Sequence, residues 1–195
     1  MKRIKIFIPI LCCLAACILP FPSVSAESTP LKNDCTIIGL DLSTLNELQI
    51  IDAGSRDDFL HWAVWSQKSE GGLSVKLALL KYTDKGPVVL QMLERKDAYE
   101  PSIKRIYQWR FGKYPVLALT YQYGAAAEQL EILGIDNNSR PVLLDEQLGD
   151  VIQWGTCKGQ IIVGIYSRPE GQLVPSWYRW REETHKMYQI HCVPE

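Results

Sequence analysis

Paired and clustered carboxylates are the residues of this chain best suited to chemistry. Asp57 and Asp58 are adjacent, and Asp145 and Glu146 are followed closely by Asp150. Two carboxylates flanking a sugar linkage act as acid and nucleophile or base in glycoside hydrolysis, and the same oxygens are the ligands that calcium prefers. Acids are also common at turns because turns are solvated. We favour the solvated turn and predict no catalytic residue here, with a secreted hydrolase using loop carboxylates as the alternative.

The three histidines offer little to a metal or a general base. His61 falls on the same alternating strand face as Trp65, where a hydrogen-bonded structural histidine is expected. His191 adjoins Cys192, but no further residues follow at the spacing of a metal site. Nucleophile elbows, phosphate-binding glycine loops and His-Glu-x-x-His are all absent from the sequence. We therefore expect no cofactor and no metal, and we leave enzymatic activity open while favouring a protein without it.

The first 26 residues predict export. Three basic residues lie within the first five positions, and residues 6–19 form an apolar run of the length found in signal-peptide cores. Residues 24–26 (Val-Ser-Ala) then offer a small-residue cleavage site before Glu27. We expect residues 1–26 to be a signal peptide and the mature protein to be secreted.

A lipid anchor is the alternative to free secretion. Residues 14–17 (Leu-Ala-Ala-Cys) resemble the lipobox of bacterial lipoproteins, in which the cysteine is lipidated and becomes the new N-terminus. Lipidation at Cys17 would hold the protein at the membrane surface. An uncleaved anchor is disfavoured because Pro9 and Pro20 bracket a run too short to span a bilayer.

The mature chain is expected to form one domain. Residues 27–34 read as a flexible lead-in, and residues 35–195 have a length that suits one all-β domain with a core of its own. The whole chain has a formal net charge of −1, so loss of the three basic residues in the signal leaves about −4. A net negative charge does not indicate binding to nucleic acid, which is typical of basic proteins.

Short runs rich in Val, Ile, Tyr and Trp recur between Gly, Pro, Asn and Asp turns, which is typical of an all-β domain. The predicted strands are residues 59–66, 73–82, 87–93 and 102–109 in a first unit, 114–123, 128–135, 140–145 and 151–154 in a second, and 160–167, 175–181 and 186–192 in a third. Residues 125–131 are good helix formers, but their polar and apolar residues alternate as in a half-buried strand. We predict a strand there.

Weak internal repetition supports antiparallel meanders as the units. Residues 106–109 (Ile-Tyr-Gln-Trp) recur as residues 151–154 (Val-Ile-Gln-Trp), and residues 114–119 align with residues 159–164 at the same separation. The third unit lacks a fourth strand in this scheme. We expect residues 36–42 to supply it and to close the repeated sheets.

Three cysteines follow the signal, and export permits one disulfide among Cys35, Cys157 and Cys192. In the predicted meander Cys157 and Cys192 lie at opposite ends of a sheet, roughly 20 Å apart, which is too far for a bond. Cys35 would begin a strand beside the one that ends at Cys192. The expected disulfide is therefore Cys35–Cys192.

The closing aromatic groups of the units carry a family resemblance. Residues 107–109 (Tyr-Gln-Trp) and 177–180 (Trp-Tyr-Arg-Trp), with apolar strands and Gly-containing turns, look like β-propeller repeats of the FG-GAP or VCBS type over residues 50–192. The resemblance implies a small propeller-like domain and often an Asp-rich calcium loop. Residues 52–58 and 148–150 echo that loop without its regular Asp spacing, so no calcium ligand is carried over. Three units fall below the usual four to eight blades, and a β-sandwich is the alternative.

The aromatic residues divide between packing and recognition. Trp177 and Arg179 should face one way and Tyr178 and Trp180 the other, because strand side chains alternate. Trp, Tyr and Arg are enriched at binding hot spots, so the exposed set suits a sugar or peptide contact. We expect an exported, non-catalytic binding or accessory module of the bacterial envelope, with a protein or carbohydrate partner and membrane contact only through Cys17.

Overall fold

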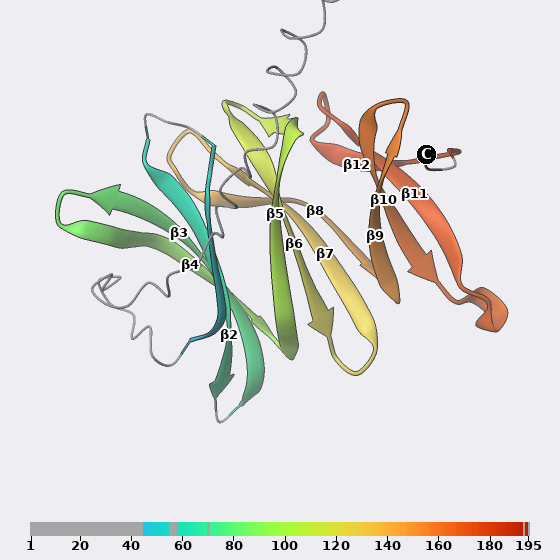
Figure 1. Cartoon of the computed structure of the whole chain (residues 1–195), viewed down its shortest axis with the longest axis horizontal. Helices are drawn as coiled ribbons and strands as arrows, with labels where there is room; N and C mark the ends of the chain where they lie inside the picture. The colour runs from blue at the N-terminus through green and yellow to red at the C-terminus, as the bar shows by residue number, and fades with distance from the viewer. Residues whose placement is uncertain (1–44, 55–57, 70, 193, 195) are drawn as a thin grey trace, which may run out of the picture. The chain divides into compact units, whose positions relative to one another are not determined.

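The computed structural model describes residues 45–54, 58–69, 71–192 and 194, and in them the chain forms twelve β-strands and one short 3-10 turn. The strands make three four-stranded antiparallel sheets in chain order, none of them closed (Figure 1). The all-β prediction is confirmed. Within the described residues we find no helical segment with the length and hydropathy of a membrane span.

Each sheet is a meander of consecutive strands. The first sheet contains β1 (Asn46–Asp52), β2 (Leu60–Ser69), β3 (Gly72–Thr83) and β4 (Gly86–Lys96). The second contains β5 (Ala98–Phe111), β6 (Tyr114–Tyr123), β7 (Ala127–Ile135) and β8 (Pro141–Gly149). The third contains β9 (Val151–Cys157), β10 (Gln160–Ser167), β11 (Val174–Arg181) and β12 (Lys186–Ile190), with a 3-10 turn at Pro169–Gly171.

The strand positions agree with the sequence prediction, but their grouping into units does not. Residues 102–109 and 151–154 open the second and third sheets instead of closing the first and second. The reason is the tight turns that follow them. Gly112, at φ 60°, joins β5 to β6 in one hairpin, and Lys158 and Gly159, at φ 53° and 71°, do the same for β9 and β10. The chain changes sheets instead at the single residues Asp97 and Asp150.

The expectation that the third unit needs a strand from the N-terminal part is wrong for the same reason. With β9 included, the third sheet has four strands. The first sheet is completed by β1, a strand the sequence analysis did not predict. Residues 36–42 lie outside the described residues.

Two apolar layers separate the three sheets. Leu77 and Leu79 of the first sheet pack with Leu117 and Leu119 of the second. On the other face of the second sheet, Leu130 and Ile132 pack with Val163 of the third. The second sheet is therefore buried on both faces. A smaller apolar cluster lies on the remaining face of the first sheet and contains Ala63, Trp65, Ala78 and Leu80, packed by Leu45, Leu48 and Val89.

The tryptophans expected as repeated core anchors do pack in these layers. Trp62 is 1 % exposed in the first layer and Trp109 is 3 % exposed in the second. Trp109 stacks on Trp180 with ring centroids 5.6 Å apart, and the ring of half-buried Trp154 lies tilted at 6.0 Å from that of Trp109. Trp180 and its neighbour Tyr178 thus contribute to the core, which confirms the predicted alternation of β11.

Candidate functional site

Asp58, one member of the first predicted carboxylate pair, binds two residues of the second sheet and its first turn. Tyr114 donates its hydroxyl proton to Asp58, and the Lys113 ammonium lies 2.6 Å from the same carboxylate oxygen. Burial raises the pKa of the Tyr114 phenol, and the hydrogen bond to Asp58 raises it further. Nearby, Asp52 pairs with Arg105 at 3.1 Å. Asp57 lies outside the described residues.

The three acids of the second predicted cluster do not share a site, and each has different surroundings. Asp145 accepts hydrogen bonds from the backbone N–H of Glu146 at 2.9 Å and of Met187, in the third sheet, at 2.6 Å. Glu146 itself is exposed, and Asp150 pairs with Arg168 at 3.7 Å. Among the described residues, no group of three or more His, Cys, Asp or Glu side chains is arranged to hold a metal ion.

Two acids of the second sheet, Glu128 and Asp145, bind backbone N–H groups on the edge strands of the third sheet. β9 and β12 are the two edge strands of the third sheet. Glu128 of β7 accepts from the backbone N–H of Ile152 in β9 at 2.7 Å, and Asp145 of β8 does the same for Met187 in β12. A carboxylate that receives a backbone N–H satisfies a donor that an edge strand leaves open.

Two glutamines make the same kind of junction with both ends of their amide groups. Gln49 of β1 donates to the carbonyl of Pro101 at 2.7 Å and accepts from the N–H of Ile103 at 3.2 Å. Gln108 of β5 donates to the carbonyl of Gly159 at 3.4 Å and accepts from the N–H of Ile161 at 3.0 Å. Each amide therefore binds the carbonyl of one residue and the N–H of the residue two positions later, as a neighbouring strand would. We call these two residues amide connectors.

One buried ionic network was not predicted from the sequence. Glu131 of β7 is 2 % exposed and accepts two hydrogen bonds from Arg95 of β4, at 2.5 and 2.8 Å. Tyr121 donates its hydroxyl to the same carboxylate at 2.7 Å. Burial, followed by the hydrogen bond to Glu131, raises the pKa of Tyr121 well above its usual value. The geometry is that of a structural pair between sheets, with every carboxylate oxygen occupied.

Two histidines, His61 and His185, lie against aromatic rings. His61 lies against Tyr82 with ring centroids 4.4 Å apart, which fits the structural role predicted for it. His185 meets the edge of Phe111 at 4.9 Å. His191 is exposed beside Cys192, whose sulfur is bonded to another cysteine and so is not present as a thiolate ligand.

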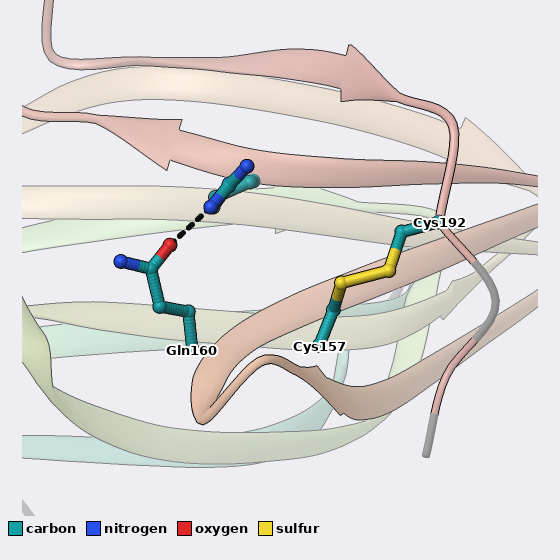
Figure 2. Close-up of a disulfide and its surroundings, with 4 residues drawn as sticks. Cys157, Gln160 and Cys192 are labelled. Atoms are coloured by element: carbon teal, nitrogen blue, oxygen red, sulfur yellow. Dashed lines mark hydrogen bonds between the residues drawn. A yellow bond between two sulfur atoms is a disulfide. The ribbon is translucent and has the colours of Figure 1, made fainter.

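The predicted disulfide Cys35–Cys192 is wrong, because the structure bonds Cys192 to Cys157, with their Cα atoms 6.7 Å apart (Figure 2). The prediction failed because it rested on the wrong grouping of strands and on a flat sheet. His191 and Cys192 follow the end of β12, and Pro194 lies over the sheet, 3.2 Å from the position a Cβ would take at Gly155 of β9. Cys35 lies outside the described residues.

The remaining candidate is the face of the third sheet that turns away from the second, which we call the outer face. The register places Gln153, Gly164, Trp177 and Ile190 in one row across it. The Trp177 ring lies on Gly164, where an added Cβ would come within 2.8 Å of the indole. Tyr166 meets that ring edge-on at 6.2 Å.

Cations lie beside these aromatic residues on the outer face. Arg179 and Arg181 both lie over the ring of Tyr188, at 5.8 and 4.4 Å, and Arg179 also donates to Gln160. A shallow hollow of about 400 Å³ adjoins Trp177, between the start of β11 and the end of β12. It is lined by Pro175, Ser176, Trp177, Gln189, Ile190, His191 and Cys192.

Comparison of the chain with protein-family models, curated proteins and solved structures returned no match. The resemblance to FG-GAP or VCBS repeats thus stays a prediction from the sequence.

Proposed function

We propose that this protein is an exported, non-catalytic binding module of the cell envelope, which recognises a partner through the outer face of its third sheet. The observation that carries the proposal is the composition of that face. Half-buried Trp177 lines a hollow and meets Tyr166, and Arg179 and Arg181 lie on the same face, which is the residue combination enriched at binding hot spots.

Use of the carboxylates supports binding over hydrolysis. Asp58, Asp145 and Asp150 each engage a partner within the protein, and they do so on different elements. A glycoside hydrolase needs two carboxyl groups on either side of one substrate bond. Residues held in junctions between strands are poorly placed to serve that geometry.

The disulfide supports an extracytoplasmic location, since such bonds persist in oxidising compartments. The export signal at residues 1–26 and the lipid-anchor alternative at Cys17 lie outside the described residues and remain part of the proposal. Intact mass of the protein from its native host distinguishes them. A chain that begins at Glu27 supports free secretion, and one that begins at a lipid-bearing Cys17 supports anchoring.

The architecture proposed with this function is an open, propeller-like stack in which each meander acts as one blade. Its support is the repetition: three meanders in the same strand order, with side chains of the first and second sheets bound to strands of the sheet that follows. A β-sandwich-type packing of the same sheets accounts for the apolar layers equally well.

Binding is tested with the purified protein on a glycan array and on a displayed peptide library. We expect a ligand whose binding is lost in Trp177→Ala and kept in Tyr123→Ala, which removes an exposed aromatic side chain, 46 % accessible, from the second sheet. Equal binding by both variants would place recognition elsewhere. Catalytic turnover of a glycan, lost on substitution of Asp58 or Asp145, would favour the hydrolase instead.

A further inference from the structure

We infer that the hollow beside Trp177 is a site of thiol–disulfide exchange, at which a dithiol reductant attacks Cys192 and thereby dismantles the hollow. This adds a means of regulation to the proposed binding face, and it rests on the proposed function only for its effect on binding. Three observations support it: where the Cys157–Cys192 bond lies, which of its sulfur atoms a thiol can reach, and what the bond holds together.

The bond joins the two edges of the third sheet. Cys157 is the last residue of β9 and Cys192 follows the end of β12 by two positions, and β9 and β12 are the edge strands. The edges of a flat four-stranded sheet lie roughly 14 Å apart, because neighbouring strands are about 4.8 Å apart. The disulfide holds the two Cα atoms 6.7 Å apart (Figure 2). It therefore clamps the sheet around β10 and β11.

The clamped part of the outer face is closed to a partner. Ile162 of β10 lies on this face, since its neighbour Val163 faces the second sheet, and it is 0 % exposed. Side-chain atoms of Pro194, Trp177 and Ile162 converge at 3.2, 3.5 and 3.6 Å from the position a Cβ would take at Gly155. A partner meets Trp177 at the hollow instead, beside the end of β12.

The two sulfur atoms differ in access. Cys157 is 6 % exposed, whereas Cys192 is half-buried and lines the hollow together with His191. In thiol–disulfide exchange a thiolate attacks one sulfur while the other leaves, and access decides which sulfur is attacked. The hollow, of about 400 Å³, gives an incoming thiol a route to Cys192. Cys192 is therefore the sulfur attacked, and Cys157 is the leaving group.

A dithiol reductant of the thioredoxin class supplies the two electrons that the reaction needs. Its first thiolate forms a bond to the sulfur of Cys192, the Cys157–Cys192 bond breaks, and Cys157 leaves as a thiolate that takes up a proton. Its second thiolate then attacks the reductant's own sulfur in the mixed disulfide, which releases Cys192. The reductant departs as a disulfide, and the two protons that its thiols lose balance the two that the cysteines gain.

Reduction removes one wall of the hollow. Four of the seven lining residues belong to the segment from Gln189 to Cys192, and the other three lie at the start of β11. The ladder between β11 and β12 ends at the pair Trp177–Ile190, so His191 and Cys192 lie beyond it. Once Cys192 is released from Cys157, these two residues can move away from Trp177. The proposed binding face is therefore complete only in the oxidised protein.

The site of attack is tested on the exported protein after alkylation of any remaining thiol groups, so that only the disulfide can react. A thioredoxin-class reductase whose second active-site cysteine is replaced by serine stops at the mixed disulfide, and peptide mapping locates the link. We expect the link at Cys192 in the folded protein. A link at Cys157, or no reaction until the protein is unfolded in urea, would overturn the inference.

Loss of the hollow is measured by tryptophan fluorescence after reduction by the intact reductase. We expect a red shift and stronger quenching by acrylamide, because Trp177 becomes more exposed. The change should be absent in Trp177→Phe and kept in the matched variant Trp154→Phe, which alters a half-buried tryptophan between the second and third sheets. An unchanged spectrum, or an equal change in Trp177→Phe, contradicts the inference.

The effect on binding is measured with a ligand selected on the glycan array or from the peptide library. We expect its binding to the oxidised protein to be lost on reduction. Equal affinity in the two redox states refutes the regulation and leaves the proposed binding function standing. If no ligand is found while the link at Cys192 and the Trp177 change are both observed, the proposed function fails and the exchange site is supported.

Discussion

Removal of Arg95 should strongly destabilise the protein, because it leaves the Glu131 carboxylate buried with only one strong donor. The Arg95 side chain is 27 % exposed and that of Glu131 3 % exposed, so the cost falls mainly on the acid. Breaking a fully buried pair costs about 3–5 kcal/mol. Since Arg95 is partly solvated and Tyr121 still donates, we expect about 3 kcal/mol for Arg95→Met. Arg140→Met, which removes an exposed arginine, should cost less than about 0.5 kcal/mol.

The double variant Arg95→Met with Glu131→Leu separates the strength of the pair from the penalty of leaving one charge alone. Apolar replacement of both members of a buried pair is often neutral. The buried Tyr121 hydroxyl loses its acceptor in the double variant, so we expect a cost of about 1–3 kcal/mol, still well below the sum of the two single effects. Urea unfolding followed by tryptophan fluorescence is measured for the unmodified protein, Arg95→Met, Glu131→Leu, the double variant and the control Arg140→Met. Additive effects, or a cost below about 1 kcal/mol for Arg95→Met, would refute the view of Glu131 as a buried, paired carboxylate.

Three further expectations follow from the same structure. Because the pKa of Tyr121 is raised in the folded state, the protonated hydroxyl contributes to the free energy of unfolding fully below about pH 10, and this contribution is lost as the pH rises above that value. Tyr121→Phe should therefore flatten the alkaline fall in stability. An unchanged pH profile would contradict the assignment. Reduction of Cys157–Cys192, which lie 35 residues apart, should lower the free energy of unfolding by about 3–4 kcal/mol, with no change in the urea midpoint as the contrary result. Gly164→Val should displace the Trp177 ring, cost about 1–3 kcal/mol and red-shift the fluorescence, whereas an unshifted spectrum would show that the ring lies elsewhere.

The strands could be predicted from the sequence because period-two alternation and turn residues survive in each of them. β7 is the clearest case. Residues 125–131 favour a helix by propensity, yet alternation indicated a strand, and Ala127–Ile135 is one. The assignment of strands to sheets could not be read in the same way, since a turn such as Lys158-Gly159 and a crossing at Asp150 are both short polar breaks. The cysteine prediction failed with that assignment.

The junction residues escaped prediction for a different reason. Alternation in β7 places Leu130 and Ile132 on one face and Glu131 on the other, which in isolation suggests an acid in solvent. The second sheet has no solvent face, because both of its sides are covered by other sheets. Buried polar positions of its strands, such as Glu131, therefore mark contacts between sheets. Gln108 belongs to the same class, and its repetition at residue 153 was the one signal in the sequence that could have revealed it.

The disulfide also determines how the protein carries mechanical load. Tension applied at the C-terminal end reaches Cys192 and passes directly to Cys157, so the 35-residue loop that contains β10, β11 and β12 is excluded from extension while the bond is intact. The pull is delivered to β9, whose Ile152 N–H is held by Glu128 of the second sheet. The oxidised protein should therefore yield first at the junction between the second and third sheets, and the reduced protein by unzipping of β12 from β11.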